Sequence, residues 1–293
     1  MINDTSKEFI RRHIGPSEED MGKMLKFIGA NSLDDLIKKT VPEEILLKDK
    51  LKINNPTSEH ESMKEVKIIS EKNKLYKNYI GMGYYNTYMP NVILRNIYCN
   101  PGWYTAYTPY QPEVAQGRLE MLLNFQQMVI DFTGMDIANA SLLDESTAAA
   151  EAIGLSRRLD KNNSNKIFIS QDCNPQTIDV IKTRTEVFGL KLIIGDQDKD
   201  LSNVDGNIIC GVISYPGTLG DIKDPSEAIS KIHKKNGKAI LVCDLLALAK
   251  LKTPAELGAD IAVGNSQRFG IPMGYGGPHA AFFATKDENK RAM

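Results

Sequence analysis

Residues 258–284 read GADIAVGNSQRFGIPMGYGGPHAAFFA, and this stretch predicts two short buried strands joined by a glycine-rich loop. The apolar runs Ile261–Val263 and Ala280–Phe283 are the expected strands. The glycines between them permit positive φ angles and a close approach of the backbone to another group. They are Gly264, Gly270, Gly274, Gly276 and Gly277. The polar tip of the loop is Ser266–Gln267–Arg268, and the loop contains no lysine.

A strand, a glycine-rich loop and a returning strand is how several pyridoxal phosphate enzymes present the lysine that forms a Schiff base. Gln267 and Arg268 cannot take that role, because an amide forms no imine and an arginine stays protonated. The stretch is therefore either a cofactor loop without its anchoring lysine or an ordinary glycine-rich turn. The rest of the chain decides between these two interpretations.

Composition excludes several classes of protein. The 293 residues are 42% hydrophobic and 25% charged, as in soluble globular proteins, and this length can bury one large core or a core plus a smaller appended domain. With 36 basic and 37 acidic residues, the formal net charge is −1, which argues against binding to nucleic acid or an anionic membrane. No apolar run approaches the roughly 20 residues that span a bilayer, and the N-terminus lacks the apolar core of a secretory signal.

The cysteines suggest a reduced compartment. Cys99, Cys173, Cys210 and Cys243 are scattered without CxxC spacing, so the sequence indicates neither a zinc site nor a disulfide framework. A cytoplasmic location is the simplest interpretation. We expect no metal site, and we interpret His279 as a structural histidine, because no second ligand-type residue is spaced to pair with it.

Residues 1–75 predict a polar N-terminal helical segment. Ser17, Ser32 and Ser58 are placed to cap helices, and Pro42 suits the first turn of a further helix. The segment is too short and too polar to enclose a core, so we expect it to pack over a neighbour. Residues 76–293 then form the large domain.

Residues 79–117 differ in character from the rest of the chain. They hold most of the tyrosines, four prolines and the only tryptophan, Trp103. Without a helical or strand period, they predict a long ordered connection, and loops of this length are usually functional or interfacial. An aromatic belt that packs one helix onto another is the alternative interpretation.

From Leu119 onward, helical and strand patterns alternate. The expected strands lie at 167–169, 192–194, 208–213 and 239–242, and the expected helices at 119–134, 148–159, 175–188 and 225–236. The alternation predicts an α/β domain with a mainly parallel sheet. Ligands of such sheets bind beyond the carboxyl ends of the strands, where the chain places Asn174, Tyr215–Pro216, Asp244 and the loop 264–278.

Five stretches that span nearly the whole chain resemble the N-terminal half of the glycine decarboxylase (P-protein) family of the glycine cleavage system. They read FIRRHIGPSEEDM from Phe9, GMGYYNTYMPNVILRNI from Gly81, NPGWYTAYTPYQPEVAQGRLEMLLNFQQMVIDFTGMDIANASLLDESTAAAEA from Asn100, ISYPGTLGDI from Ile213, and residues 258–284. The opening stretch looks more like the long single-chain form than the separate first subunit of split enzymes.

The resemblance implies the fold of the type I pyridoxal-phosphate-dependent transferases, arranged as two homologous halves. In that family the second half carries the lysine and the cofactor, and the first half lacks both and completes the interface. Aligned on the shared Phe-x-Ile-Pro of residues 269–272, Gln267 falls at the lysine position. Residues 287–293 begin a helix where the family continues for several hundred residues. We therefore expect a fragment that is inactive by itself.

The expected phosphate position also departs from an active site. In this fold the phosphate binds at the N-terminus of a helix, which here begins LDESTA at residues 143–148. The carboxylates of Asp144 and Glu145 would complement the helix dipole and repel a phosphate. We therefore interpret Asp144 as a helix cap rather than a ligand. Ser146 stands where the family's first half usually has glycine.

Two further positions are interpreted as inherited rather than active. Asn174 stands where the first half more often has histidine. Asp244 stands where the catalytic half holds the pyridine nitrogen of the cofactor, and without a pyridine it is expected to cap the next turn.

The reaction implied by the resemblance is decarboxylation of glycine with pyridoxal 5'-phosphate and transfer of the aminomethyl group to the lipoyl group of the H-protein. The implied partners are the catalytic half, the lipoylated H-protein, glycine and a further copy in a homo-oligomer. This half would supply interface and pocket wall, with Tyr104, Tyr107, Tyr110 and Gln111 as the candidate residues.

Two alternatives remain open. One is a scaffold with no residue near an active site. The other is an independent pyridoxal enzyme that uses Lys250 or Lys252, although both follow Asp244 too closely to lie on the anchoring loop.

Overall fold

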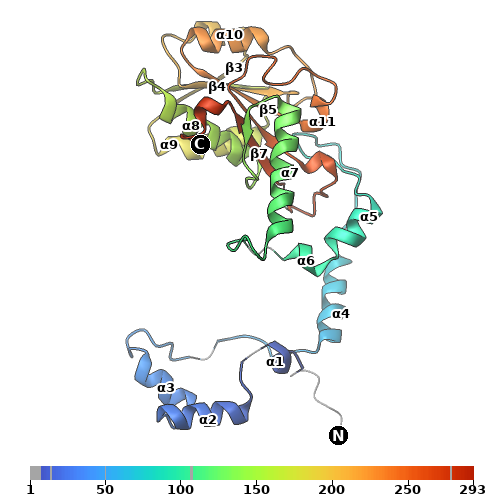
Figure 1. Cartoon of the computed structure of the whole chain (residues 1–293), viewed down its shortest axis with the longest axis vertical. Coiled ribbons are helices and arrows are strands. Elements are labelled where there is room, and N and C mark those ends of the chain that lie inside the picture. Colours follow the sequence, from blue (N-terminus) through green and yellow to red (C-terminus); the bar gives the residue numbers. More distant parts are fainter. Residues whose placement is uncertain (1–7, 14, 50, 106–107, 278) are drawn as a thin grey trace. The chain divides into compact units, whose positions relative to one another are not determined.

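The computed structural model of the chain describes residues 8–13, 15–49, 51–105, 108–277 and 279–293 (Figure 1). These residues divide into two compact units, one up to Lys77 and the other from Asn78 to Met293.

The first unit is helical. Its helices are α1 (Glu8–His13), α2 (Glu18–Ile28), α3 (Leu33–Thr40) and α4 (Glu59–Ser70). Ser17, Ser32 and Ser58 each accept a hydrogen bond from a backbone amide of the helix that follows, so the three predicted caps are confirmed. The helices α2, α3 and α4 contain no buried residue.

The prediction of a helix beginning at Pro42 is wrong. Its backbone forms only turn-type bonds, in which the Ile45 amide donates to the Pro42 carbonyl at 3.2 Å and the Leu46 amide to the Glu43 carbonyl at 3.3 Å. An exposed segment this short gains too few bonds to offset the cost of helix nucleation.

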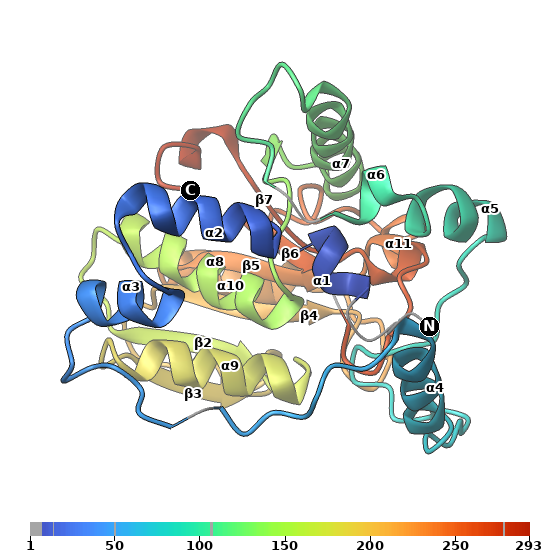
Figure 2. The same ribbon diagram turned by 90° about the horizontal axis from the view of Figure 1, so that it is seen from below.

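The second unit is built on a seven-stranded sheet with the order β1-β7-β6-β5-β4-β2-β3. The strands are β1 (Ile137–Ala138), β2 (Lys166–Ser170), β3 (Lys191–Gly195), β4 (Cys210–Tyr215), β5 (Lys238–Cys243), β6 (Ile261–Asn265) and β7 (Ala281–Thr285). Strands β2 to β6 are parallel, and β7 pairs antiparallel with both β6 and β1. Figure 2 shows the strands in this order from β3 to β7. The predicted mainly parallel sheet is confirmed.

Helices cover both faces of the sheet (Figure 1). They are α7 (Gln116–Thr133), α8 (Glu145–Leu159), α9 (Pro175–Glu186), α10 (Ser226–Lys234) and α11 (Leu245–Leu248). One buried cluster joins α7, α10 and α11 to the face that carries Phe168, Leu241 and Phe282. The other joins α8 and α9 to the face that carries Ile169 and Val263. The central strands β2, β4, β5 and β6 are therefore buried on both sides, as expected for a covered parallel sheet.

Residues 79–117 contain more helix than their sequence predicts. Short helical turns occur at α5 (Asn91–Ile93), the π-helical η2 (Leu94–Tyr98) and α6 (Pro101–Tyr104). Elements of three to five residues are too short to show a helical period, so the pattern of the sequence misses them.

Within the described part of the chain, no helix is both long and apolar enough to cross a membrane.

Candidate functional site

The carboxyl ends of β4, β5 and β6 and the first turns of α8 and α9 enclose a cavity of about 320 Å³. We call this cavity the strand-end site and define it by six of its lining residues. They are Tyr85, Glu145, Asn174, Asp244, Asn265 and Arg268. The sequence placed Asn174, Pro216, Asp244 and the loop 264–278 beyond the strand ends, and the structure brings residues from all four to this cavity.

Asp144 and Ser146 are engaged at the first turn of α8. The Asp144 carboxylate accepts a hydrogen bond from the Thr147 amide at 2.7 Å, and the Asp144 amide donates to the Thr147 hydroxyl. Asp144 is thus the N-cap residue of α8. Ser146 is buried, and its hydroxyl lies 3.1 Å from that of Thr177, which ties α8 to α9.

Glu145 lies at the N-terminus of α8, where a phosphate would bind in a cofactor-loaded site. Each of its two carboxyl oxygens accepts a hydrogen bond at 3.0 Å, one from the Asn174 side-chain amide and the other from that of Asn265. Burial raises the pKa of Glu145; the two amide hydrogen bonds oppose that shift, and the carboxylates of Asp244 and Asp144 add to it. The N-terminus of α8 is therefore already occupied by a carboxyl group of the protein itself, that of Glu145.

Asp244 has protein partners on both carboxyl oxygens. One oxygen accepts hydrogen bonds from the backbone amides of Leu246 and Ala247, at 2.8 and 3.2 Å, so that Asp244 caps α11. The other oxygen lies 3.2 Å from Nη1 of Arg268. The guanidinium carbon of Arg268 lies in turn 5.1 Å from the centre of the Tyr85 ring.

Gln267 is buried next to this group, with 2% of its surface exposed, in the single turn η4 (Gln267–Phe269). Its backbone amide donates to the Asn265 side-chain oxygen at 3.1 Å. Among the described residues, its side-chain nitrogen Nε2 has no hydrogen-bond partner.

Pyridoxal phosphate does not fit the strand-end site. Gln267 stands at the position expected for the Schiff-base lysine, and its amide cannot form an imine. The carboxyl group of Glu145 takes the place expected for the phosphate. The aspartate expected to meet the pyridine nitrogen is paired with Arg268. At the expected phosphate and pyridine positions the cofactor would meet carboxyl groups that already have protein partners, and at the expected lysine position it would meet an amide that cannot form the Schiff base.

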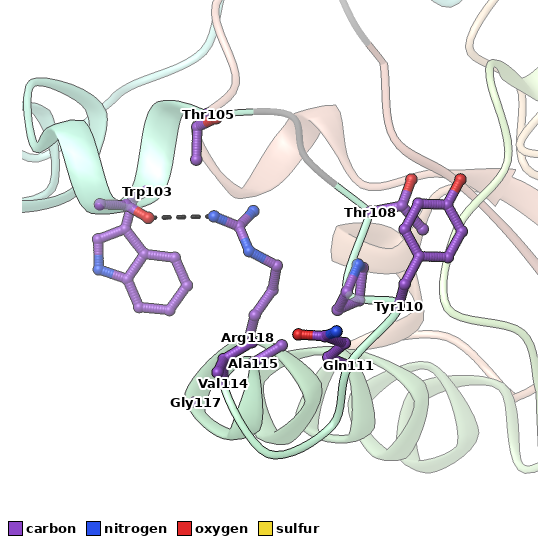
Figure 3. Close-up of a pocket in the computed structure, with 11 residues that line it drawn as sticks. Trp103, Thr105, Thr108, Tyr110, Gln111, Val114, Ala115, Gly117 and Arg118 are labelled. Atoms are coloured by element: carbon purple, nitrogen blue, oxygen red, sulfur yellow. Dashed lines mark hydrogen bonds between the residues drawn. The ribbon is translucent and has the colours of Figure 1, made fainter.

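A second cavity, of about 550 Å³, lies between α6 and the start of α7 (Figure 3). Tyr110 and Gln111 line it, and Tyr104 at the end of α6 is 66% exposed. Tyr107 lies outside the described residues. The Arg118 side chain projects into the cavity, donates to the Gly102 carbonyl at 3.0 Å and lies 6.0 Å from the centre of the Trp103 ring.

His279, Lys250 and Lys252, which the sequence also brought into consideration, do not line either of these two cavities. The His279 ring meets Tyr84 edge-on, with ring centres 5.3 Å apart. Lys250 and Lys252 are exposed. Across the described ranges, no group of three or more histidine, cysteine, aspartate or glutamate side chains is placed to hold a metal ion.

The sequence did not single out three residues of the strand-end site as candidates: Tyr85 in the aromatic segment, and Asn265 and Arg268 in the loop 264–278. The sequence shows Arg268 as a cation at the tip of a loop without lysine. It also shows Asp244 as an aspartate that is expected to have no pyridine nitrogen as its partner. Pairing these two observations would have predicted the ion pair. Nothing in the local pattern marks Tyr85 or Asn265.

The chain is similar to proteins of one family. The family model described as glycine cleavage system P-protein matches residues 11–293. A glycine dehydrogenase (decarboxylating) from Pelagibacter ubique (strain HTCC1062) is 73% identical over 293 residues, which are 100% of this chain and 30% of that protein. A glycine dehydrogenase (decarboxylating) from Dechloromonas aromatica (strain RCB) is 54% identical over 98% of this chain and 29% of its own length. The chain thus spans about 30% of the length of these relatives.

A solved structure agrees with these matches. The crystal structure of a glycine decarboxylase (P-protein) of the glycine cleavage system, in inhibitor-bound form, superposes with a TM-score of 0.83 at 32% identity. The match covers 95% of this chain and 64% of that one. The expected α/β fold of the type I pyridoxal phosphate enzymes is confirmed.

Proposed function

Because the chain belongs to the glycine cleavage system P-protein family, we propose that it is the lysine-less N-terminal half of a glycine dehydrogenase. The observation that carries the proposal is the strand-end site, where Gln267 replaces the lysine and Arg268 pairs with Asp244. This half does not hold the cofactor, so a catalytic half must hold it. The two halves together decarboxylate glycine and pass the aminomethyl group to the lipoyl group of the H-protein.

The cofactor on the catalytic half supplies the electron sink for decarboxylation. The share of this chain is to shape and enclose the pocket of that half. Tyr110 and Gln111 support this role, because both line an open cavity that already holds a guanidinium group, that of Arg118. Tyrosine combines an apolar ring with a polar tip, which suits a wet pocket or an interface. We include Tyr104 and Tyr107 in the same proposed wall.

The remaining features of the proposal follow from the family. We propose glycine and the lipoylated H-protein as substrate and partner, a homo-oligomer as the assembly, and the cytoplasm as the location. We also propose that residues 1–75 form a helical segment and residues 76–293 a separate large domain. The alternative function is a scaffold half with no residue near the active site.

The first experiment asks which half holds the cofactor. The chain is incubated with pyridoxal phosphate and reduced with borohydride, alone and together with the catalytic half, and the labelled peptides are identified by mass spectrometry. We expect no label within 258–284 and a labelled lysine in the catalytic half. Gln267→Lys serves as the matched variant. It supplies the amine but leaves Glu145 and Arg268 in place, so we expect it to remain unlabelled. Stoichiometric label in wild-type 258–284 would overturn the proposal.

The second experiment separates the pocket wall from the scaffold. In the complete enzyme, Tyr107→Phe or Tyr110→Phe should lower glycine–bicarbonate exchange about tenfold, the effect of losing one hydrogen bond of roughly 1.4 kcal/mol. Thermal melting should change little. Tyr79→Phe is the control, because Tyr79 belongs to the same aromatic segment and is exposed. Unchanged exchange in both pocket variants favours the scaffold, and a parallel loss of melting temperature would assign the tyrosines to packing.

A further inference from the structure

Residues 78–89, which we call the tyrosine segment, lie against the strand-end site. The Thr87 hydroxyl donates to the Ile271 carbonyl at 2.8 Å, and the Gln176 side-chain amide donates to the Met82 carbonyl. The ring of Tyr84 meets that of His279 edge-on. The segment is thus held both by the first turn of α9 and by the loop that follows β6.

Two glycines allow the backbones to come this close. Gly83 has a φ of +87°, and a Cβ added to it would lie 2.6 Å from the side-chain nitrogen of Asn174. Gly270 has a φ of +122°, and a Cβ added to it would lie 2.9 Å from the Tyr88 carbonyl oxygen. A side chain at Gly270 would meet backbone atoms of the segment and push it away, and one at Gly83 would displace the Asn174 side chain that bonds Glu145.

Arg268 connects the segment to the sheet electrostatically. Its guanidinium group pairs with Asp244, which follows β5, and the same group lies over the ring of Tyr85 in the segment. A planar guanidinium can form a directed ion pair and stack on an aromatic face at the same time, which an ammonium group does less well. Both Arg268 and Asp244 are partly buried, so solvent weakens their attraction less than on an open surface.

We infer that the strand-end site has become the anchor of the tyrosine segment, with Arg268 as the positioning residue. The fold places a ligand between the strand ends and the residues above them. Here the guanidinium group takes that place, facing Asp244 on one side and Tyr85 on the other. The site holds a segment of its own chain instead of a cofactor. The value of this position for catalysis rests on the proposed function, whereas the anchoring itself does not.

The first test measures anchoring by hydrogen exchange and mass spectrometry on peptides covering 78–89 in the complete protein. Arg268→Met should raise the exchange rate there about tenfold, as expected for the loss of a partly buried ion pair and a cation–π contact. Arg268→Lys should raise it less, because the charge facing Asp244 remains. Arg184→Met is the matched control, since it removes an exposed ion pair with Glu151 elsewhere and should leave 78–89 unchanged.

The Tyr85 side of the contact has its own pair of variants. Tyr85→Phe keeps the aromatic face and should exchange like the wild type, whereas Tyr85→Leu should resemble Arg268→Met. Equal exchange in Arg268→Met and Arg184→Met would overturn the anchor, whatever the function of the chain.

The second test measures glycine–bicarbonate exchange in the same variants. Arg268→Met should lower the turnover number about tenfold, Arg268→Lys should recover part of it, and the melting temperature should change little. A segment that loosens while turnover stays at the wild-type level would overturn the positioning role of Arg268. That result would leave the borohydride test of the proposed function unaffected, so the two failures can be told apart.

Discussion

The two ends of β5 and β6 hold carboxyl groups in opposite electrostatic surroundings. At the amino end, Asp260 is buried and lies near three basic side chains, with 2.8 Å to His233 Nε2, 2.9 Å to Lys286 Nζ and 3.6 Å to Lys238 Nζ. It also accepts a hydrogen bond from the Ala239 amide at 2.9 Å. Burial alone would raise the pKa of Asp260, but the bonds from His233, Ala239 and Lys286 outweigh it and hold the pKa well below its usual range.

At the carboxyl end, Glu145 is held by two uncharged amides and has Asp244 and Asp144 as neighbours. Its pKa is raised, first by burial and then by those carboxylates. The amino end therefore stabilises its charge, and the carboxyl end keeps carboxyl groups crowded together. The crowded end is the one where this fold binds ligands, and residual unfavourable interactions of this kind are typical of functional sites.

Removal of the Asp260 carboxylate should produce the largest effect. Asp260→Ala leaves basic side chains and the Ala239 amide without their shared acceptor, so we expect the free energy of unfolding to fall by about 3 kcal/mol or more. Urea unfolding followed by circular dichroism measures the change. Asp260→Asn is the companion variant, because it keeps an acceptor for the Ala239 amide and should lose less. If Asp260→Ala lost less unfolding free energy than a variant that removes an exposed ion pair, the proposed contrast between the two ends of the sheet would be contradicted.

The pH dependence of stability should differ in sign between the two ends. The folded pKa of Asp260 is lowered, so its contribution is complete above its unfolded pKa of about 4 and is lost as pH falls through the folded value. The advantage of the wild type over Asp260→Asn should therefore shrink below about pH 4.

Glu145 should behave in the opposite way. Its folded pKa is raised, so its contribution is complete below its unfolded pKa of about 4.3 and is lost as pH rises through the folded value. Glu145→Gln cannot ionise, so it should gain stability relative to the wild type as pH rises. Unfolding free energies of the two chains between pH 4 and pH 8 test this expectation. A difference that does not change with pH would mean that the carboxyl groups at this end are not in conflict.

The smallest effect should come from an exposed ion pair. Asp179 and Lys182 lie 3.1 Å apart on α9, and both side chains are more than half exposed. Asp179→Asn should change the free energy of unfolding by only about 0.3 kcal/mol, because solvent screens such pairs. A change as large as that of Asp260→Ala would show that burial does not explain the difference between the two ends.

The sequence alone determined most of the secondary structure and showed that the loop 264–278 contains no lysine. Runs of apolar residues located β2 to β7, and serine or aspartate before a helical pattern located the caps at Ser17, Ser58 and Asp144. These features depend on residues within a few positions of one another, so they can be recognised from the sequence alone. The short helical elements within residues 91–104 were not predicted, because each holds less than two turns of helix.

Only the tertiary structure decided which polar groups meet. Glu145 is bonded to Asn174, 29 residues away, and to Asn265, 120 residues away. Arg268 meets Asp244 and Tyr85 only because the sheet order brings the end of β5 beside β6 and leaves room for the tyrosine segment above them. No local pattern encodes that order, since it is set by how the whole set of strands and helices buries its apolar faces. The sequence therefore predicted a loop without the Schiff-base lysine, and the fold determined which polar groups meet at the strand ends.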